Sequence, residues 1–292
     1  MGKSKVYFTK EITSNSLIEI YKAMGVTLKG KVAVKISTGE PGGHNFLEPN
    51  LIKDLVNKLN GTIVECNTAY PGGRNESNVH WETIEKHGFK AISPCDILDE
   101  DGDMTILVKG GKNLRENYVG NHLQNYDSML ILSHFKGHAM GGFGGALKNM
   151  SIGLGSSRGK LHIHTSGEGG NFEDMFTADH DSFLESMADA DKSVMDFMGR
   201  ENIVYINVAN KLSVDCDCDA NPDEPKMADI GILASTDPVA LDQASVDLVY
   251  QSKDPGKSYL IERMESRNGI HTVISAESLG LGFREYELIN ID

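Results

Sequence analysis

The 292-residue sequence lacks the features that mark a membrane-spanning or secreted chain. No run approaches 18 apolar residues, so we expect no transmembrane helix and no membrane partner. Residues 1–12 lack the apolar core of a signal peptide. Met1 and Gly2 are followed by Lys5 and Val6, which is not the Ser/Thr context of N-myristoylation. These absences predict a cytoplasmic protein.

An excess of positive charge is also absent. Lys and Arg number 28 against 42 Asp and Glu, and the formal net charge is −14. Because binding to nucleic acid requires a basic surface, we expect no nucleic-acid partner. Acidic residues concentrate at 165–230, whereas basic residues gather near 109–160. A locally basic cleft in an acidic protein suits a small anionic molecule.

Cysteine is scarce, and neither a CxxC pair nor a ferredoxin-type CxxCxxC run is present. A disulfide framework is not expected in a cytosolic chain. Cys216 and Cys218 form a C-x-C pair whose sulfurs share a face if the segment is extended. The flanking residues Asp215, Asp217 and Asp219 would raise the pKa of both thiols unless a cation is present.

The C-x-C pair is interpreted either as metal ligands or as part of a solvated acidic loop. Two thiolates are too few to hold an iron–sulfur cluster alone. His162 and His164 form an H-x-H pair that would share a face in an extended segment, which suits a metal ion. The alternative for these histidines is an exposed strand edge.

Alternation of strand-like and helix-like segments predicts an α/β fold, with a mostly parallel sheet flanked by helices. We expect one α/β domain over residues 1–292. Gly- and Pro-rich loops at 37–44, 67–74 and 133–148 each follow a strand-like run. Ligands of such sheets lie beyond the carboxyl ends of the strands, so these loops are expected to line one crevice. The predicted strands are 31–37, 62–66, 104–109, 128–132, 202–209 and 230–235, and the predicted helices are 49–59, 78–88, 179–198, 239–250 and 256–268.

The most informative segment is the glycine-rich stretch 133–155. His138 is a candidate proton donor or acceptor near neutral pH, and Lys148 can neutralise an oxyanion or a phosphate. We therefore predict both as catalytic residues; the alternative is a structural turn with two solvated side chains. Backbone N–H groups of the glycines are expected to approach the ligand. The predicted ligand-binding glycines are Gly141, Gly142, Gly144 and Gly145.

Further ligand-binding candidates lie in or near the three loops. Lys35 stands inside an apolar strand, where a charge needs a partner. Arg74 ends the second loop and can clamp an anion. The remaining candidates in the third loop are His134, Lys136 and Asn149.

Five segments, at 32–42, 67–74, 87–89, 133–160 and 229–249, resemble domain-of-unknown-function family 362, which is described as iron–sulfur-associated. Many relatives carry a ferredoxin-like insert with CxxCxxC runs after the segment equivalent to 160–167. Here an acidic, helix-forming segment at about 165–200 stands in its place. The loop 138–148 also resembles, distantly, the glycine-rich loop in the N-terminal domain of nickel-pincer lactate racemase. That resemblance implies proton transfer by His138 and contact of Lys148 with an anionic group.

Three functions remain open at this stage. The first is an enzyme that binds a small carboxylate or phosphate in the crevice and uses His138 and Lys148. The second is a redox protein in which Cys216 and Cys218, together with His162, His164 or Cys66, hold a metal ion or a 4Fe-4S cluster and serve a redox partner. The third is a non-catalytic binding protein, for which a homo-oligomer is one form.

Overall fold

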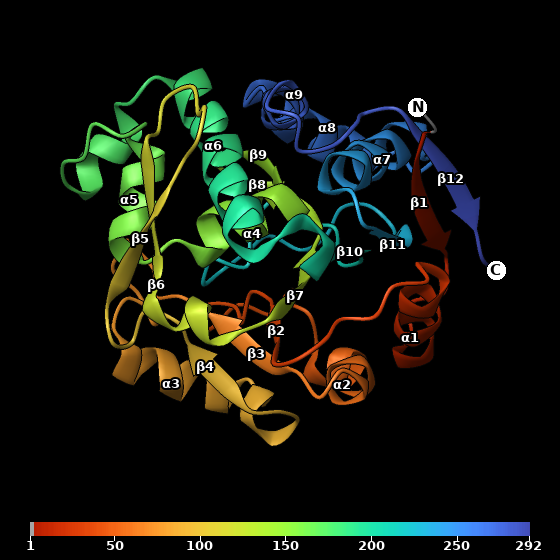
Figure 1. The fold of residues 1–292 in the computed structure, drawn as a ribbon. Coiled ribbons are helices and arrows are strands. Elements are labelled where there is room, and N and C mark those ends of the chain that lie inside the picture. The colour runs from red at the N-terminus through yellow and green to blue at the C-terminus, as the bar shows by residue number, and fades with distance from the viewer. Residues whose placement is uncertain (1–2) are drawn as a thin grey trace.

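A central eight-stranded sheet with helices on both faces forms the fold (Figure 1). The structure is a computed structural model that describes residues 3–292. Only β11 runs against its neighbours, β1 and β10, and the other adjacent strands are parallel. The predicted α/β fold with a mostly parallel sheet is confirmed. The strands in spatial order are β12 (Tyr286–Asn290), β1 (Ser4–Thr9), β11 (Gly231–Ser235), β10 (Ile203–Ala209), β7 (Ser128–His134), β2 (Val32–Lys35), β3 (Thr62–Glu65) and β4 (Cys95–Ile97).

Strand β7 shows why the sheet is apolar on both sides. Met129 and Ile131 face one hydrophobic cluster, whereas Leu130 and Leu132 face the other. A strand covered by helices on both faces has no polar side, so its sequence is a continuous apolar run. One face is covered by α1 (Ser14–Ala23), α2 (Pro49–Lys58) and α3 (Ser77–Lys86). The other is covered by α4 (Ala146–Leu154), α6 (His180–Met198), α7 (Pro238–Gln251), α8 (Lys257–Ser266) and α9 (Ile270–Ser278).

Two small antiparallel hairpins lie outside the central sheet. The predicted strand 104–109 is β5 (Asp103–Leu107), which pairs with β6 (Glu116–Gly120) and not with the main sheet. The predicted loop 133–148 contains the second hairpin, β8 (Lys136–His138) with β9 (Gly142–Gly144), and then enters α4. Helix α5 (Ser157–His164) packs beside α6 and β6. Single 3-10 turns are η1 (Phe89–Ala91), η2 (Asn121–Asn125), η3 (Phe172–Phe176) and η4 (Arg200–Asn202).

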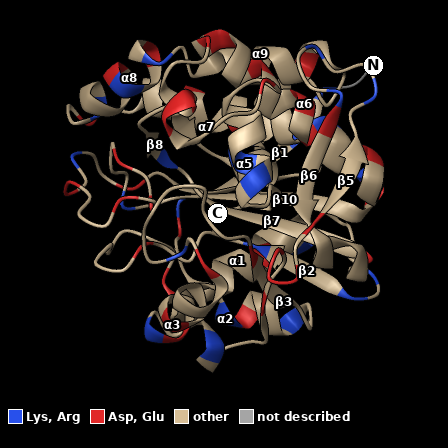
Figure 2. Ribbon diagram, turned by 90° about the vertical axis from the view of Figure 1, so that its left-hand side faces the viewer, with Lys and Arg blue, Asp and Glu red and all other residues tan. Residues whose placement is uncertain are grey.

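Several elements were not predicted. The first strand and helix, together with α4, α5 and α9, were missed, and the acidic segment 165–200 contains η3 and α6. Within residues 3–292, none of the helices combines the length and the apolar character needed to cross a bilayer. Charged residues of both signs are spread over the outer helices and loops (Figure 2).

Candidate functional site

A cavity of about 290 Å³ lies at the carboxyl ends of β2, β3 and β7. Its wall includes residues from all three predicted loops, as the expected crevice requires. Helices α4 and α5, the C-x-C loop that follows β10 and the 3-10 turn η3 complete it. Large apolar side chains give the cavity an apolar part, namely Met140, Ile152, Phe172, Met175 and Phe176.

Positive charge dominates the polar part of the cavity wall. Five Lys or Arg side chains line it against a single carboxylate, Glu65, in a chain whose formal net charge is −14. Fold topology therefore concentrates cations where the parallel strands end. These cations are Lys35, Arg74, Lys136, Lys148 and Lys160.

Arg74 is fully engaged by neighbouring side chains. Its Nε donates to Glu40 Oε1 at 2.8 Å and its Nη1 to Glu65 Oε1 at 2.9 Å, while Nη2 donates to the Tyr70 hydroxyl at 3.1 Å. Burial alone would raise the pKa of Glu65, but Arg74 and Lys35 outweigh it and hold that pKa well below its usual range. Arg74, predicted as an anion clamp, therefore joins the first two loops to β3.

Lys35 and Asn149 hold each other between β2 and α4. Lys35 Nζ donates to Asn149 Oδ1 at 3.0 Å, and Asn149 Nδ2 donates to the Lys35 carbonyl at 3.2 Å. Lys35 Nζ also donates to the Ile36 carbonyl. Burial lowers the pKa of Lys35 to about 8, although Glu65 opposes this shift. The predicted ligand residues Lys35 and Asn149 thus line the cavity with most of their polar groups already paired.

His134 and Lys136 share one buried carboxylate, Asp217. His134 Nδ1 lies 2.8 Å from Asp217 Oδ1 and its Nε2 lies 2.7 Å from the Asn210 carbonyl, while Lys136 Nζ donates to Asp217 Oδ2 at 2.8 Å. Both nitrogens of His134 face acceptors, so the ring satisfies both only when it is protonated. Burial would raise the pKa of Asp217, but His134 and Lys136 hold it below its usual range.

Lys148 differs from the other cavity cations. Lys160 Nζ donates to the Gly155 carbonyl at 2.6 Å, and the three cations described above are paired. Lys148, on the first turn of α4, has no hydrogen-bond or ion-pair partner among residues 3–292. Its charge also contributes to lowering the pKa of His138. An ammonium that lines a cavity without a partner would be stabilised by a bound anion.

His138 is held in one neutral form by the backbone of the β8–β9 hairpin. Its Nδ1 accepts the N–H groups of Gly141 at 2.8 Å and Met140 at 3.2 Å. An Nδ1 that accepts carries no proton, so the neutral ring carries its proton on Nε2. Burial, then Lys148, lowers the pKa of His138. The ring therefore presents an N–H donor to the cavity.

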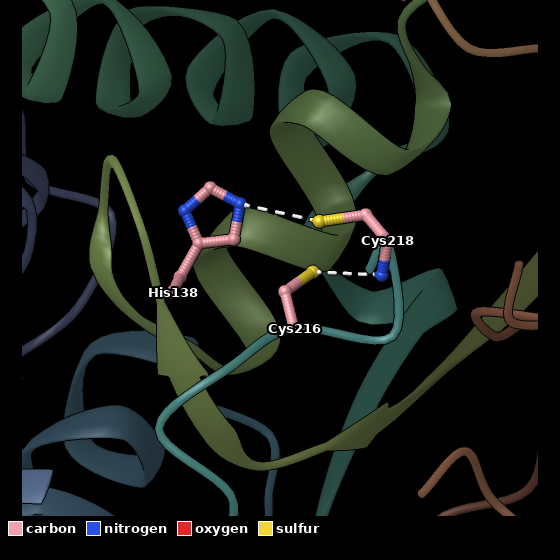
Figure 3. Close-up of side chains that lie close together, drawn as sticks. All are labelled: His138, Cys216 and Cys218. Atoms are coloured by element: carbon pink, nitrogen blue, oxygen red, sulfur yellow. Dashed lines mark hydrogen bonds between the residues drawn. The ribbon is translucent and has the colours of Figure 1, made fainter. Parts of the chain in front are cut away.

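Cys216 and Cys218 lie next to this donor (Figure 3). Cys218 Sγ is 3.9 Å from His138 Nε2, and the Cys218 N–H donates to Cys216 Sγ at 3.2 Å. The Cys218 thiol, together with Lys148 and His138, holds the pKa of Cys216 well below its usual range, whereas that of Cys218 is raised. The sequence predicted that neighbouring aspartates raise the pKa of both thiols unless a cation is present, and at Cys216 the cation is Lys148, while Asp217 turns away to His134 and Lys136.

The absence of a side chain at Gly137 allows the C-x-C loop to pack closely against β8. A Cβ at Gly137 would come within 2.2 Å of the Val214 carbonyl, and Gly137 N donates to the Ser213 carbonyl at 2.8 Å. Only glycine permits this approach of β8 to the loop. The glycine-rich sequence therefore brings Cys216 and Cys218 up to His138.

One imidazole and two sulfurs from these residues lie within 4.8 Å of one another, a spacing that a metal ion could bridge. The chemistry of His138 does not fit this role. A metal on Nε2 would displace the proton there while Nδ1 still accepts backbone N–H groups, which leaves an imidazolate. The unpaired charge of Lys148 also opposes a cation at this point. The residues present therefore suit an anion better than a metal.

The other predicted metal ligands are not assembled with the cysteines. His162 and His164 lie on helix α5, not on an extended segment, so two residues apart they point to different sides. His162 Nε2 lies 3.1 Å from the Glu116 carbonyl. His164 lines the cavity, where its Nδ1 donates to the Lys160 carbonyl at 2.6 Å and burial lowers its pKa to about 3. Cys66 is separate, donating to the Leu154 carbonyl.

The backbone N–H groups at the start of α4, just after the glycine-rich loop, already have a side-chain acceptor within the protein. Gly144 and Gly145 line the cavity, but Gly141 and Gly142 do not. The N–H groups of Ala146 and Leu147 at the start of α4 donate to Asp242 at 2.8 and 3.0 Å. Sequence reasoning missed this cap and several lining residues, among them Glu65, Tyr70 and Lys160, and it named His164 only as a metal ligand. It also missed the apolar group of η3, whose one available signal is the pair Phe172 and Phe176 in an acidic segment.

Residues 32–247 match the profile of the family described as Domain of unknown function (DUF362). A comparison with curated proteins finds no match. Among solved structures, the lactate racemase apoprotein from Thermoanaerobacterium thermosaccharolyticum is similar, with a TM-score of 0.46 and 10% identity over 84% of this chain and 57% of that one. A protein from Thermotoga maritima is similar with a TM-score of 0.43 and 11% identity, over 89% of this chain and 59% of its own. This chain thus spans less than two thirds of either protein.

Proposed function

Because the chain belongs to the domain-of-unknown-function family DUF362, as predicted, and that description names no activity, we propose a function from the cavity itself. The cavity binds a small organic anion, a carboxylate or a phosphate ester, between Lys148 and His138. The observation that carries this proposal is the ammonium of Lys148, which lacks a partner among residues 3–292 while the other four cavity cations are paired.

Each part of the wall has a role in this proposal. Lys148 neutralises the anionic group, and the Nε2–H of His138 donates to an oxygen of the same group. The apolar side chains of Met140, Phe172 and Phe176 cover an apolar portion of the ligand. His138 in this form is a neutral hydrogen-bond donor that polarises a bound oxygen, and not a base, because its free lone pair already accepts two N–H groups.

The first test is the affinity of the protein for benzoate and for phenyl phosphate, measured by calorimetry. Lys148→Met removes the unpaired cation, so we expect a loss of about 1.5–3 kcal/mol, or roughly 10- to 100-fold in Kd. Lys22→Met is the matched control, since Lys22 is half-exposed on the opposite face of the sheet and pairs with Glu19 at 2.7 Å. Equal affinities of wild type and Lys148→Met, or no binding of either probe, would overturn the proposal.

A second test separates the donor role of His138 from an acid–base role. Since burial lowers the pKa of His138, its ring is expected to stay neutral across the range around pH 6.5 in which an ordinary histidine titrates. The affinity for benzoate should therefore stay flat between about pH 6 and pH 7.5. His138→Gln keeps a side-chain N–H and should retain most of the affinity, whereas His138→Ala should not. If the affinity instead changes with pH as a histidine titrates, and this pH dependence disappears in His138→Gln, the donor role is wrong.

A further inference from the structure

Two sulfurs face the same cavity from the first and third positions of one tight turn. The Asp219 N–H donates to the Cys216 carbonyl at 2.9 Å, which closes a turn over residues 216–219. The Cys216 and Cys218 side chains both line the cavity, and their sulfurs lie within 4.8 Å of each other (Figure 3). Asp217, between them, is buried against His134 and Lys136 and fixes the orientation of the turn. To form a disulfide, the two sulfurs must approach to about 2.05 Å.

The surroundings of Cys216 stabilise an anionic sulfur. Its Sγ accepts the Cys218 N–H at 3.2 Å, and His138 Nε2 and the unpaired ammonium of Lys148 are close by. Thiolates in such electropositive, partly accessible places are the reactive ones in proteins. The other two thiols donate to backbone carbonyls, Cys66 to Leu154 at 3.3 Å and Cys95 to Ser93 at 3.6 Å. Thiol reactivity is therefore expected at the C-x-C pair.

We propose that Cys216 and Cys218 form a dithiol–disulfide pair that reduces a small disulfide carrying an anionic group. Cys216 thiolate attacks one sulfur of the substrate, which breaks the substrate S–S bond, forms a mixed disulfide and releases one thiolate. Cys218 then attacks Cys216 Sγ, which forms the Cys216–Cys218 disulfide and releases the second half of the substrate. The proton of Cys218 passes to that leaving group, and two electrons have moved from the protein to the substrate.

The preference for an anionic disulfide rests on the proposed function of Lys148, whereas the redox pair itself does not. A substrate whose charge lies against Lys148 brings its S–S bond to the wall that carries Cys216. The apolar side chains of Met140, Phe172 and Phe176 are suited to its non-polar part. A small aromatic disulfide with carboxylate groups has this chemistry.

The test uses 5,5′-dithiobis(2-nitrobenzoate) with the reduced, folded protein and counts the coloured thiolate released. We expect two thiolates per chain from the pair, and a tryptic peptide 212–226 that is lighter by two hydrogens. Cys218→Ser should release one thiolate and keep the mixed disulfide, whereas Cys216→Ser should react at least tenfold more slowly. Cys95→Ser, a change on β4 away from the cavity, is the matched control and should behave as wild type. A peptide 212–226 that carries two separate adducts, or none, would overturn the redox pair.

Lys148→Met distinguishes the two proposals. It should slow the reaction with the anionic probe roughly tenfold or more, because the local positive charge that concentrates the probe is lost. The neutral 2,2′-dithiodipyridine should slow less, since for this probe only the stabilisation of the Cys216 thiolate by Lys148 is lost. If both probes slow equally but the disulfide still forms, the anion site is wrong and the redox pair stands. If the anionic probe slows more than the neutral one but no disulfide forms in any variant, the redox pair is wrong and the anion site stands. Thermal unfolding of each variant shows that it is folded.

Discussion

Asp217→Ala is expected to lower the free energy of unfolding by about 3–5 kcal/mol, because it leaves the buried ammonium of Lys136 and the buried ring of His134 without their common carboxylate. His134 and Lys136 are both buried, and each has an oxygen of Asp217 as a close partner. The Asp217 carbonyl also accepts the Glu40 N–H at 2.9 Å, so the same residue links the C-x-C loop to the first loop. Urea unfolding at neutral pH measures the effect.

The matched control lies two residues away. Asp215 pairs with Arg263 at 3.5 Å and accepts the Asp223 N–H at 3.0 Å in a partly exposed position, so Asp215→Ala should cost about 1–2 kcal/mol, less than Asp217→Ala. The pH dependence of stability provides a second test of the role of Asp217. The pKa of Asp217 is lowered in the folded protein, so its contribution is fully present above the ordinary value near 3.9 and is lost as the pH falls through the folded value. The difference in the free energy of unfolding between wild type and Asp217→Asn should become smaller below about pH 4. If this difference does not change with pH, the loss of stability comes from packing.

The fold was largely predictable because its strands have strong local signals. Apolar β-branched runs such as 32–36 form parallel strands, and the Gly- and Pro-rich loops after them meet at one edge by topology alone. That is why Lys35, Arg74, His138 and Lys148 line one cavity as predicted. The elements that were missed have weak periodicity, and helix α5 is an example: its H-x-H sequence suggested an extended segment.

The internal partners of the site could not be predicted, because they depend on contacts between distant parts of the chain. His134 and Asp217 are 83 residues apart, and Ala146 and Asp242 are 96 apart. No local pattern reveals that Asp217 pairs with both Lys136 and His134 or that Asp242 occupies the start of α4. Sequence reasoning therefore identified four of the five cationic side chains of the cavity but could not tell paired from unpaired. That distinction leaves Lys148 as the residue on which an anion is expected to bind.

Arg74→Met is expected to destabilise the protein by about 3–5 kcal/mol at neutral pH, since it leaves Glu40 and Glu65 buried without their shared guanidinium. Glu65 keeps the Thr38 N–H at 2.9 Å and the more distant charge of Lys35 at 3.9 Å, whereas Glu40 keeps the Gly73 N–H at 3.0 Å without a compensating charge. The double variant Arg74→Met/Glu40→Gln should recover part of the loss by removing one of the two carboxylates. Urea unfolding of the three proteins measures these differences.

The pH dependence of this loss identifies its cause. In the wild type the pKa of Glu65 is lowered, so the stability it contributes is present above the ordinary value near 4.3 and is lost as the pH falls. In Arg74→Met the buried Glu65 loses the charge that most lowers its pKa, so the pKa of Glu65 rises, and protonation at lower pH removes its buried charge. Both effects reduce the difference in the free energy of unfolding between wild type and variant as the pH decreases from about 7 to about 4.5. A gap that stays the same over this range would mean that Arg74 acts by filling space with its aliphatic stem, and that the buried charges of Glu40 and Glu65 are balanced without it.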